Sequence, residues 1–400
     1  MSWVQSTLGE VADIFSGYAF KSADMNSEGG TPLIKIKNIA DSAVSHQCDA
    51  FLNKDFNLAK FERFHLLRDD FLVAMTGQGS VGRIGKMRDY KPGFYVNQRV
   101  AIVRVNPEKA NPVFIFYQIA TRSNELELFK KANGAGQPNI SAKQIGELPV
   151  VLPSTEQQQY IADVLSSYDD LIENNQKQIK LLEEAAQRLY KEWFVDLRFP
   201  GHKTTPITDG IPEGWSQGVL GDVVVESGRK ISKDNREGYS YYLPIDCLPK
   251  KSLGYIATNE IALAESSLVA FAPRDIIFGA MRPYFHKVVV ARDSGITRTT
   301  CFVLNTGNPA YWAYAVMLMF SSDTVDYATQ ISVGTTMPYT RWKDFKSMPI
   351  IVPSEECAIV FGKEIYPIIT KINGLAKQIV LLQQARDRLL PKLMNGEIEV

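Results

Sequence analysis

The sequence predicts an α+β protein made of two similar halves, each a strand-rich mixed α/β domain followed by a long helix. The segment LPVVLPS at 148–154 recurs as MPIIVPS at 348–354, an offset of 200 residues (348 − 148 = 200). The segment WVQSTLGEV at 3–11 resembles WSQGVLGDV at 215–223, an offset of 212 residues (215 − 3 = 212). Copies of this length are each large enough to form a domain with its own core.

The two copies predict the domain boundaries. We expect a first domain at 1–147, a central helix at 148–200, a second domain at 201–347 and a C-terminal helix at 348–400. The segment GHKTTPITDGIPEGW at 201–215 is rich in Gly, Pro and Thr, which is typical of a linker.

Each predicted helix carries a heptad pattern, with apolar residues at alternating spacings of three and four, which is typical of a seam between two helices. The seam positions of the first helix are Ile161, Leu165, Tyr168, Ile172, Asn175, Ile179, Leu182 and Leu189. Those of the second are Phe361, Ile368, Ile372, Leu375, Ile379 and Leu382. We expect the helices to pack as an antiparallel coiled coil that relates the halves by a pseudo-twofold axis. Asn175 and Arg386 interrupt the apolar rows and are candidates for fixing the register.

The ends of the helices carry their own signals. Ser154 with Gln157 predicts a capping box at the start of the first helix. In the second helix, Pro367 and Gly374 predict a kink or break, and Pro391 predicts the end, because proline removes a backbone hydrogen bond and clashes with the preceding turn.

Composition places the chain among ordinary globular proteins. It is 45% hydrophobic and 22% charged with a net charge of zero, which argues against a general polyanion binder. Its four cysteines, at 48, 247, 301 and 357, form no CxxC pair, so neither a zinc site nor a disulfide framework is predicted. The longest apolar run, at 310–320, is too short to span a bilayer, and we see no signal peptide. We therefore expect a cytoplasmic protein without a membrane partner.

One short motif suggests a nucleotide cofactor. MTGQGSVGRIGK at 75–86 holds Gly77, Gly79 and Gly82 in G-x-G-x-x-G spacing. A dinucleotide site also needs a helix that opens at the glycines and an acidic residue about 20 positions later. The following sequence indicates turns and strands, and the apolar residues 101–103 stand where the acid is required. The motif therefore does not predict a cofactor site.

The doubled order of these elements resembles the specificity subunit of type I restriction–modification systems. The residues that carry the resemblance are LGEV and LGDV at the domain starts, DDFLVAMTG…VGRIGK with its counterpart RDIIFGAMRPYFHKVVV, NQRVAIVRV with TRTTCFVLN, and the two segments LPVVLPS and MPIIVPS. It covers the whole chain, and its specificity lies in the order of the motifs rather than in any one of them. It implies a protein without catalysis that reads two short DNA half-sites across an unread gap, one with each target-recognition domain.

The resemblance also implies partners. These are double-stranded DNA, two adenine-N6 methyltransferase subunits, and restriction (translocase) subunits held through the methyltransferase. No cofactor or metal is implied for this chain, because AdoMet belongs to the methyltransferase subunit and ATP with Mg²⁺ to the restriction subunit.

On this resemblance, two loops in each domain contact DNA, and the glycines let the first loop approach it closely. Glutamine suits adenine and arginine suits guanine, whereas Lys86 and Arg88 suit phosphates. The candidates in the first domain are Gln78, Ser80, Arg83, Lys86, Arg88, Gln137, Asn139, Ser141 and Lys143. Those in the second are Arg282, Tyr284, His286, Lys287, Thr335, Thr336, Tyr339, Arg341 and Lys343.

Two other classes of function stay open. NPAY at 308–311 approaches the NPPY motif of adenine-N6 methyltransferases, but Ala310 replaces its second proline and no glycine-bearing AdoMet loop precedes it. We interpret Asn308 as a helix cap with Pro309 in the first turn. Methyl transfer from labelled AdoMet by the purified chain would identify an enzyme. A coiled-coil scaffold that binds only proteins would differ by not binding DNA when a methyltransferase partner is present.

Overall fold

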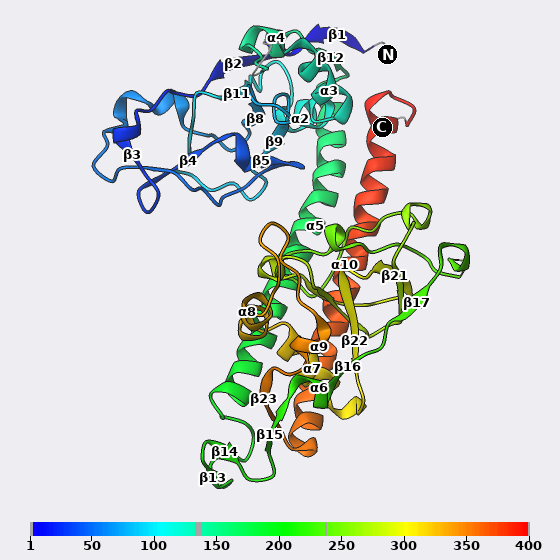
Figure 1. The fold of residues 1–400 in the computed structure, drawn as a ribbon. Coiled ribbons are helices and arrows are strands. Elements are labelled where there is room, and N and C mark those ends of the chain that lie inside the picture. The colour runs from blue at the N-terminus through cyan, green and yellow to red at the C-terminus, as the bar shows by residue number, and fades with distance from the viewer. Residues whose placement is uncertain (1–2, 133–137, 237, 399–400) are drawn as a thin grey trace. The chain divides into compact units, whose positions relative to one another are not determined.

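The structure is a computed structural model, and it describes residues 3–132, 138–236 and 238–398 (Figure 1). The chain forms two compact units. Unit 1 comprises residues 1–169 with 386–400, and unit 2 comprises residues 170–385. Each contains strands and helices, which confirms the predicted mixed α/β class.

Unit 1 is built on a six-stranded sheet. Its strands, in spatial order, are β2 (Ala12–Ser16), β11 (Val100–Val105), β8 (Phe71–Ala74), β9 (Ile84–Lys86), β6 (Ser42–Val44) and β5 (Ile39–Ala40). Alternate residues of β8 enter different cores, because side chains along a strand point to opposite faces. Phe71 and Val73 pack with helix α2 (Pro112–Ile119), whereas Leu72 packs in a second core with Ile34. The central strands are therefore buried on both faces.

Smaller elements complete unit 1. They are a four-stranded sheet of β10 (Tyr95–Val96), β4 (Thr31–Ile34), β7 (Phe51–Leu52) and β3 (Met25–Asn26), and the helices α3 (Arg122–Lys131) and α4 (Ala142–Gly146).

Unit 2 contains a four-stranded and a three-stranded sheet. The first runs β16 (Val224–Glu226), β22 (Cys301–Thr306), β19 (Ile276–Gly279), β20 (Val288–Val290), and the second runs β17 (Arg229–Ile231), β18 (Leu268–Phe271), β21 (Gly295–Arg298). Helices α8 (Ser322–Gln330) and α9 (Trp342–Phe345) follow later in the chain. Every residue of helix α7 (Trp312–Met319) is buried. The Asn308 side chain accepts a hydrogen bond from the Ala310 amide at 3.0 Å ahead of α7, so the predicted cap is confirmed.

The two repeated sequence segments are strands, which the sequence analysis did not predict. In unit 1, β1 (Val4–Thr7) pairs antiparallel with β12 (Pro149–Leu152), and in unit 2, β15 (Ser216–Val219) pairs antiparallel with β23 (Pro349–Val352). A one-turn helix follows the first strand in both, α1 (Leu8–Val11) and α6 (Leu220–Val223). The start of each domain is thus hydrogen-bonded to the strand that precedes its long helix.

Two long helices contribute to both units, α5 (Thr155–Tyr190) and α10 (Glu355–Met394). The predicted capping box is confirmed, because the Gln157 amide donates to Ser154 Oγ at 3.3 Å and Gln157 Oε1 accepts from the Ser154 amide at 3.4 Å. The predicted break at Pro367 or Gly374 and the predicted end at Pro391 are wrong, since α10 is one helix as far as Met394. Pro367 lies on the exposed side of α10, and the opposite side is held by buried core side chains.

Within unit 2 the two helices run in opposite directions. Asn175 Nδ2 donates to Gln378 Oε1 at 3.3 Å, and the rings of Trp193 and Phe361 are 5.4 Å apart. The residue number rises by 18 along α5 (193 − 175) and falls by 17 along α10 (378 − 361). Asn175 is only 7% exposed, so this polar pair sits within an apolar seam, where it can fix the register.

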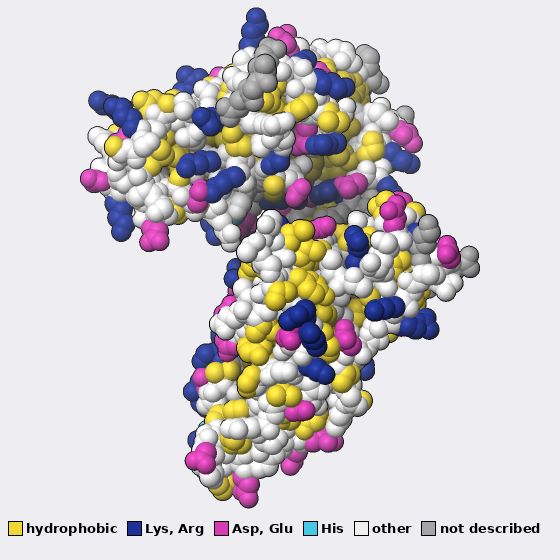
Figure 2. Space-filling view, viewed as in Figure 1, with side chains coloured by type: hydrophobic (Ala, Val, Ile, Leu, Met, Phe, Trp, Pro, Cys, Tyr) yellow, Lys and Arg dark blue, Asp and Glu magenta, His cyan; other side chains and the backbone are white. Residues whose placement is uncertain are grey.

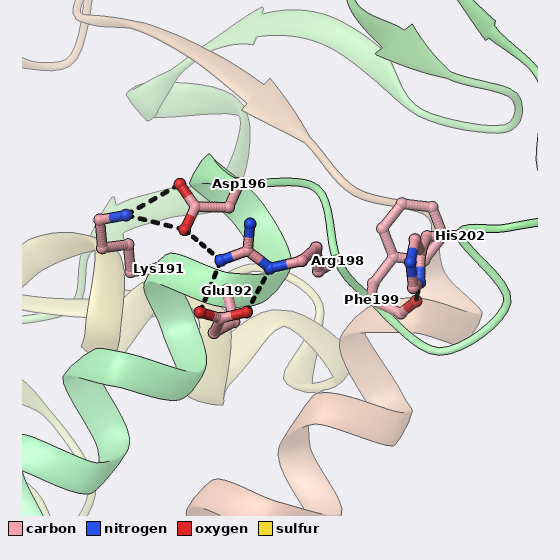
Figure 3. Close-up of polar contacts among 6 residues, drawn as sticks. All are labelled: Lys191, Glu192, Asp196, Arg198, Phe199 and His202. Atoms are coloured by element: carbon pink, nitrogen blue, oxygen red, sulfur yellow. Dashed lines mark hydrogen bonds and ion pairs between the residues drawn. The ribbon is translucent and has the colours of Figure 1, made fainter.

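Directly after the end of α5, four side chains form a network of ion pairs (Figure 3). Lys191 and Arg198 share the Asp196 carboxylate, with nitrogen–oxygen distances of 2.7 Å, and Arg198 also pairs with Glu192. The side chains of Lys191, Arg198 and Glu192 are exposed to solvent, whereas Asp196 is half-buried, so each pair stabilises the turn only modestly. Beyond them, the Phe199 ring packs 4.8 Å from Trp215, which anchors the chain as it enters the second domain.

The linker at 201–215 contains a short hairpin of β13 (Ile207–Thr208) and β14 (Ile211–Pro212). In the described part of the chain, no helix has both the length and the apolar character needed to cross a membrane. The four cysteines are free thiols.

Gly374 offers a test of the continuous helix. It lies on an exposed side of α10, and an added Cβ would meet open space. We expect Gly374→Ala to raise the free energy of unfolding by about 1 kcal/mol, because alanine loses less backbone entropy in a helix. Chemical denaturation measures the change. Gly210→Ala is the matched control: its added Cβ also meets open space, but φ is +78°, so it should destabilise. Destabilisation by Gly374→Ala would mean that α10 is broken there.

Candidate DNA interface

In unit 1, the two segments predicted to contact DNA lie side by side. Thr76 forms a β-bridge with Asn139, the Ile140 amide donates to the Met75 carbonyl at 2.9 Å, and the Gly77 amide donates to the Pro138 carbonyl at 3.2 Å. The loop after β8 and the segment before α4 are therefore one surface. Among the predicted residues, Gln137 lies outside the described part of the chain.

Unit 2 contains the same pair of segments with the same bonds. Met281 forms a β-bridge with Tyr339, the Thr340 amide donates to the Ala280 carbonyl at 3.0 Å, and the Arg282 amide donates to the Pro338 carbonyl at 2.7 Å. Each position is 200 or 205 residues from its counterpart in unit 1. Two loops that sequence reasoning placed in each domain separately are thus joined by backbone hydrogen bonds in both.

The loop ends need a left-handed backbone, which explains two of the three glycines. Gly77 has φ +105° and Gly82 has φ +86°, and the equivalent residues of unit 2, Arg282 and His286, have φ +50° and +51°. An added Cβ on Gly82 would lie 2.7 Å from the Glu125 carbonyl of α3. Gly79, between them, also has a positive φ of +74°. The backbone conformation thus accounts for glycine at all three positions independently of any contact with DNA. No helix opens after them, since β8 pairs antiparallel with β9, and the structure does not favour a dinucleotide site.

The predicted residues differ in exposure. The exposed ones are Gln78, Asn139, Ser141, Lys143, Tyr284, Thr335, Thr336, Arg341 and Lys343. The half-buried ones are Ser80, Arg83, Lys86, Arg88, Arg282, Lys287 and Tyr339. Two of the exposed residues also have structural roles: Ser141 caps α4 by accepting from the Gln144 amide, and Arg341 pairs with Asp344 at 2.6 Å.

Several basic candidates point into the protein. Lys86 Nζ lies 3.0 Å from Asp69, with only 14% of its side chain exposed, and Lys287 Nζ donates to the Ile245 carbonyl at 2.6 Å. The His286 ring is 6% exposed, its Nε2 is 3.0 Å from the Phe320 carbonyl, and burial lowers its pKa. We therefore no longer interpret His286 as a DNA contact.

Arg88 belongs to a buried polar network centred on Asp169 of α5. Arg88 Nη1 lies 2.6 Å from one carboxylate oxygen, the Tyr117 hydroxyl of α2 donates to the other at 2.7 Å, and Arg386 of α10 pairs with the first. Burial and the neighbouring carboxylate raise the pKa of Tyr117. Burial alone would lower the pKa of Arg386, but the attraction and hydrogen bonds of Asp169 and Asp387 raise it above its usual value.

The Asp169 network joins the first domain to both long helices within unit 1. Sequence reasoning missed its centre and assigned Arg88 to phosphate. The only available signal was Arg386, a charged residue in an apolar row that needs a buried counter-charge.

Unit 2 has a comparable attachment at Glu183 of α5. Its carboxylate accepts from Ser252 Oγ at 2.6 Å and from the Leu253 amide at 2.7 Å, and burial raises its pKa. Next to it, Gly254 packs so closely on Ile372 of α10 that an added Cβ would lie 2.9 Å from the Ile372 side chain.

The charges on the surface are mixed. Figure 2 shows lysine and arginine side chains interspersed with aspartate and glutamate on the face in view, in keeping with a net charge of zero. Attraction to DNA phosphates must therefore come from local groups rather than from a broad basic field.

Comparisons of sequence and structure identify known proteins that are similar to this chain. Residues 1–184 match the family model of the type I restriction modification DNA specificity domain. The chain is 29% identical to the type I restriction enzyme MjaIX specificity subunit of Methanocaldococcus jannaschii, over 72% of this chain and 69% of that one. It is 22% identical to the HindI specificity subunit of Haemophilus influenzae, over 99% of both. A crystal structure of a type I S subunit from M. genitalium has a similar fold, with a TM-score of 0.63 at 16% identity over 98% of this chain and 96% of that one.

The chain is therefore similar to DNA specificity subunits of type I restriction–modification systems, and its residues 1–184 match their DNA specificity domain. Subunits of this kind are non-catalytic, so the chain is a DNA-specificity component and not an enzyme.

Arg88 distinguishes a structural contact from a DNA contact. We expect Arg88→Ala to lower the free energy of unfolding by about 2 kcal/mol, because it removes a charged hydrogen bond from the buried Asp169 carboxylate. The salt dependence of DNA binding should stay unchanged. Lys143→Ala, at an exposed candidate, is the control: it should leave stability unchanged and reduce the slope of log K against log salt by about 1. A reduced slope in Arg88→Ala would restore it as a phosphate contact.

Proposed function

We propose that this specificity subunit reads a bipartite DNA site, with one half-site for each target-recognition domain. The observation that carries the proposal is the loop pair, which is joined by the same backbone bonds at Gly77–Pro138 and at Arg282–Pro338. Each of the two domains carries its own copy of this surface, so the chain has one reading surface for each half-site. In the first domain, Gln78 and Arg83 are the candidates for reading base edges.

The two long helices act in this proposal as an antiparallel spacer that sets the unread gap. Two polar pairs, together with the apolar seam, fix the register between the helices. Asn175 pairs with Gln378 in unit 2, and Asp169 pairs with Arg386 in unit 1. Shifting one helix along the other by a turn would separate both pairs and leave buried polar groups without partners, which costs free energy.

The proposal extends to assembly. Two methyltransferase subunits would bind this chain, and restriction subunits would join through them. The long helices carry single exposed large apolar side chains, which are available to a partner but do not by themselves mark an interface. They are Tyr160, Leu171, Leu181, Ile359 and Leu381.

Domain exchange tests whether the halves read separately. We expect that replacing residues 1–147 with the first domain of another family member changes one half-site only. The donor should supply an arginine and a tyrosine to meet Asp169, so that the attachment survives. Methylome sequencing of a host that carries the chimaera and its methyltransferase partner gives the motif. Exchange of residues 201–347 is the matched experiment and should change the other half-site. A change in both half-sites from either exchange would contradict the modular reading.

Helix insertion tests the spacer. The contacts place Gln178 of α5 opposite the region of Leu375 in α10, so four helix-forming residues are added after each. One added turn lengthens the pair by about 6 Å, close to two base pairs at about 3.4 Å each. We expect the same half-sites with a gap longer by one or two base pairs, as measured by methylome sequencing. An active variant that kept the original gap would show that the helices do not set the spacing.

A further inference from the structure

We call the loop between β8 and β9 the recognition loop of the first domain, and the loop between β19 and β20 that of the second. A two-residue turn lies beside the first of these loops, and neither of its residues was among the DNA contacts predicted from the sequence. Asp41 and Ser42 connect β5 to β6, and β6 pairs in parallel with β9 so that Ser42 lies opposite Gly85. The turn thereby reaches Arg83, and Asp41, Ser42 and Arg83 line one pocket together with Arg122. Within the part of the chain that the structure describes, neither Asp41 nor Arg83 has an ion-pair or side-chain hydrogen-bond partner.

The second domain has an equivalent turn. A 3₁₀ helix at Ile36–Asn38 precedes the first turn, and one at Ile245–Cys247 precedes Lys250 and Lys251, an offset of 209 residues (245 − 36). This turn also contacts its recognition loop. The Lys251 amide donates to the His286 carbonyl at 2.8 Å, and Lys250 Nζ lies 4.3 Å from the centre of the Phe285 ring.

The backbone conformation of these turns favours glycine, yet residues with side chains occupy them. Asp41, Ser42 and Lys251 have φ of +51°, +57° and +53°, a conformation that costs free energy in any residue with a Cβ. Glycine, asparagine and aspartate are the usual residues of such turns, so Asp41 is well tolerated there, whereas Ser42 and Lys251 are unusual. Strained backbone of this kind clusters at functional sites, which makes the two turns candidates for a functional role.

The charges of the two turns indicate different uses. Asp41 is exposed, and a carboxylate beside DNA is repelled by phosphates unless it faces a base amino group, for which the N4 amino group of cytosine is suited. Lys250 and Lys251 are exposed cations, which suit phosphates. On the basis of the proposed function, we propose that Asp41 reads a cytosine of the first half-site, and that the Lys250–Lys251 turn binds the DNA backbone at the second.

The experiment compares substitutions at Asp41 in the complex with methyltransferase subunits. Asp41→Gly removes the acceptor and relieves the backbone, so the variant should fold at least as stably as the parent chain. It should reduce discrimination at one cytosine of the first half-site by about 5- to 100-fold. Asp41→Asn keeps an acceptor oxygen and tolerates the same backbone, so it should retain most of the discrimination. Asp55→Gly, at an exposed carboxylate outside the pocket, should leave the motif unchanged.

Methylome sequencing and competition binding to duplexes that differ at single positions give the readout. The double variant Lys250→Ala with Lys251→Ala should keep both half-sites and reduce the salt slope by about 1 to 2. If the parent chain gives a bipartite motif and Asp41→Gly gives the same motif, the inference about Asp41 is wrong while the proposed function stands. Equal strengthening of binding to all sequences by Asp41→Gly and Asp41→Asn would also overturn it, since only charge repulsion would then be involved. Absence of any bipartite motif in the parent chain would overturn the proposed function, and this inference with it.

Discussion

The buried carboxylate of Asp169 constrains the whole of unit 1. A charge with 8% of its side chain exposed is tolerated only if it is paired and fully hydrogen-bonded, and here two arginines and a tyrosine hydroxyl supply the partners. They come from the loop after β9, from α10 and from α2. Sheet, covering helix and both long helices are therefore held in one arrangement, and the loops that follow β8 and precede α4 take their positions from that arrangement.

Glu183 attaches the second domain to α5 within unit 2, but its partners are uncharged. It binds a hydroxyl and backbone amides rather than cations, and burial raises its pKa. Unit 2 gains additional anchorage from aromatic packing, with the Phe194 ring 4.7 Å from Phe361 and 4.8 Å from Tyr314. The two domains are thus attached to the same pair of helices by different physical interactions, although their loops are built alike.

Residue patterns that recur at a regular spacing could be predicted from the sequence. Contacts between residues far apart in the chain could not. The heptads predicted α5 and its apolar seam, because burial of Ile172 and Ile179 leaves a signal every seven residues. The antiparallel direction was expected from the order of domains and helices along the chain, not from the heptads. Proline at 367 was misread, since the burial of its flanking residues outweighs the lost hydrogen bond. Arg88 and His286 were predicted to contact DNA, and the structure shows that each has a partner within the protein. The sequence could not reveal these partners, because a basic residue in a loop looks the same whether it meets DNA, a buried carboxylate or a carbonyl. The paired loops were found as separate segments, but their joining depends on backbone contacts between residues more than 55 positions apart.

The bonds that join the loops run from amide to carbonyl, so the identity of the neighbouring side chains does not enter them. The same hydrogen bond forms with glycine at 77 and with arginine at 282, and the same β-bridge forms with asparagine at 139 and with tyrosine at 339. A frame of this kind tolerates replacement of the residues it displays. If each domain reads its own half-site, as proposed, new recognition sequences can arise by point mutation on an unchanged backbone, and one half of the chain can diversify while the other keeps its preference.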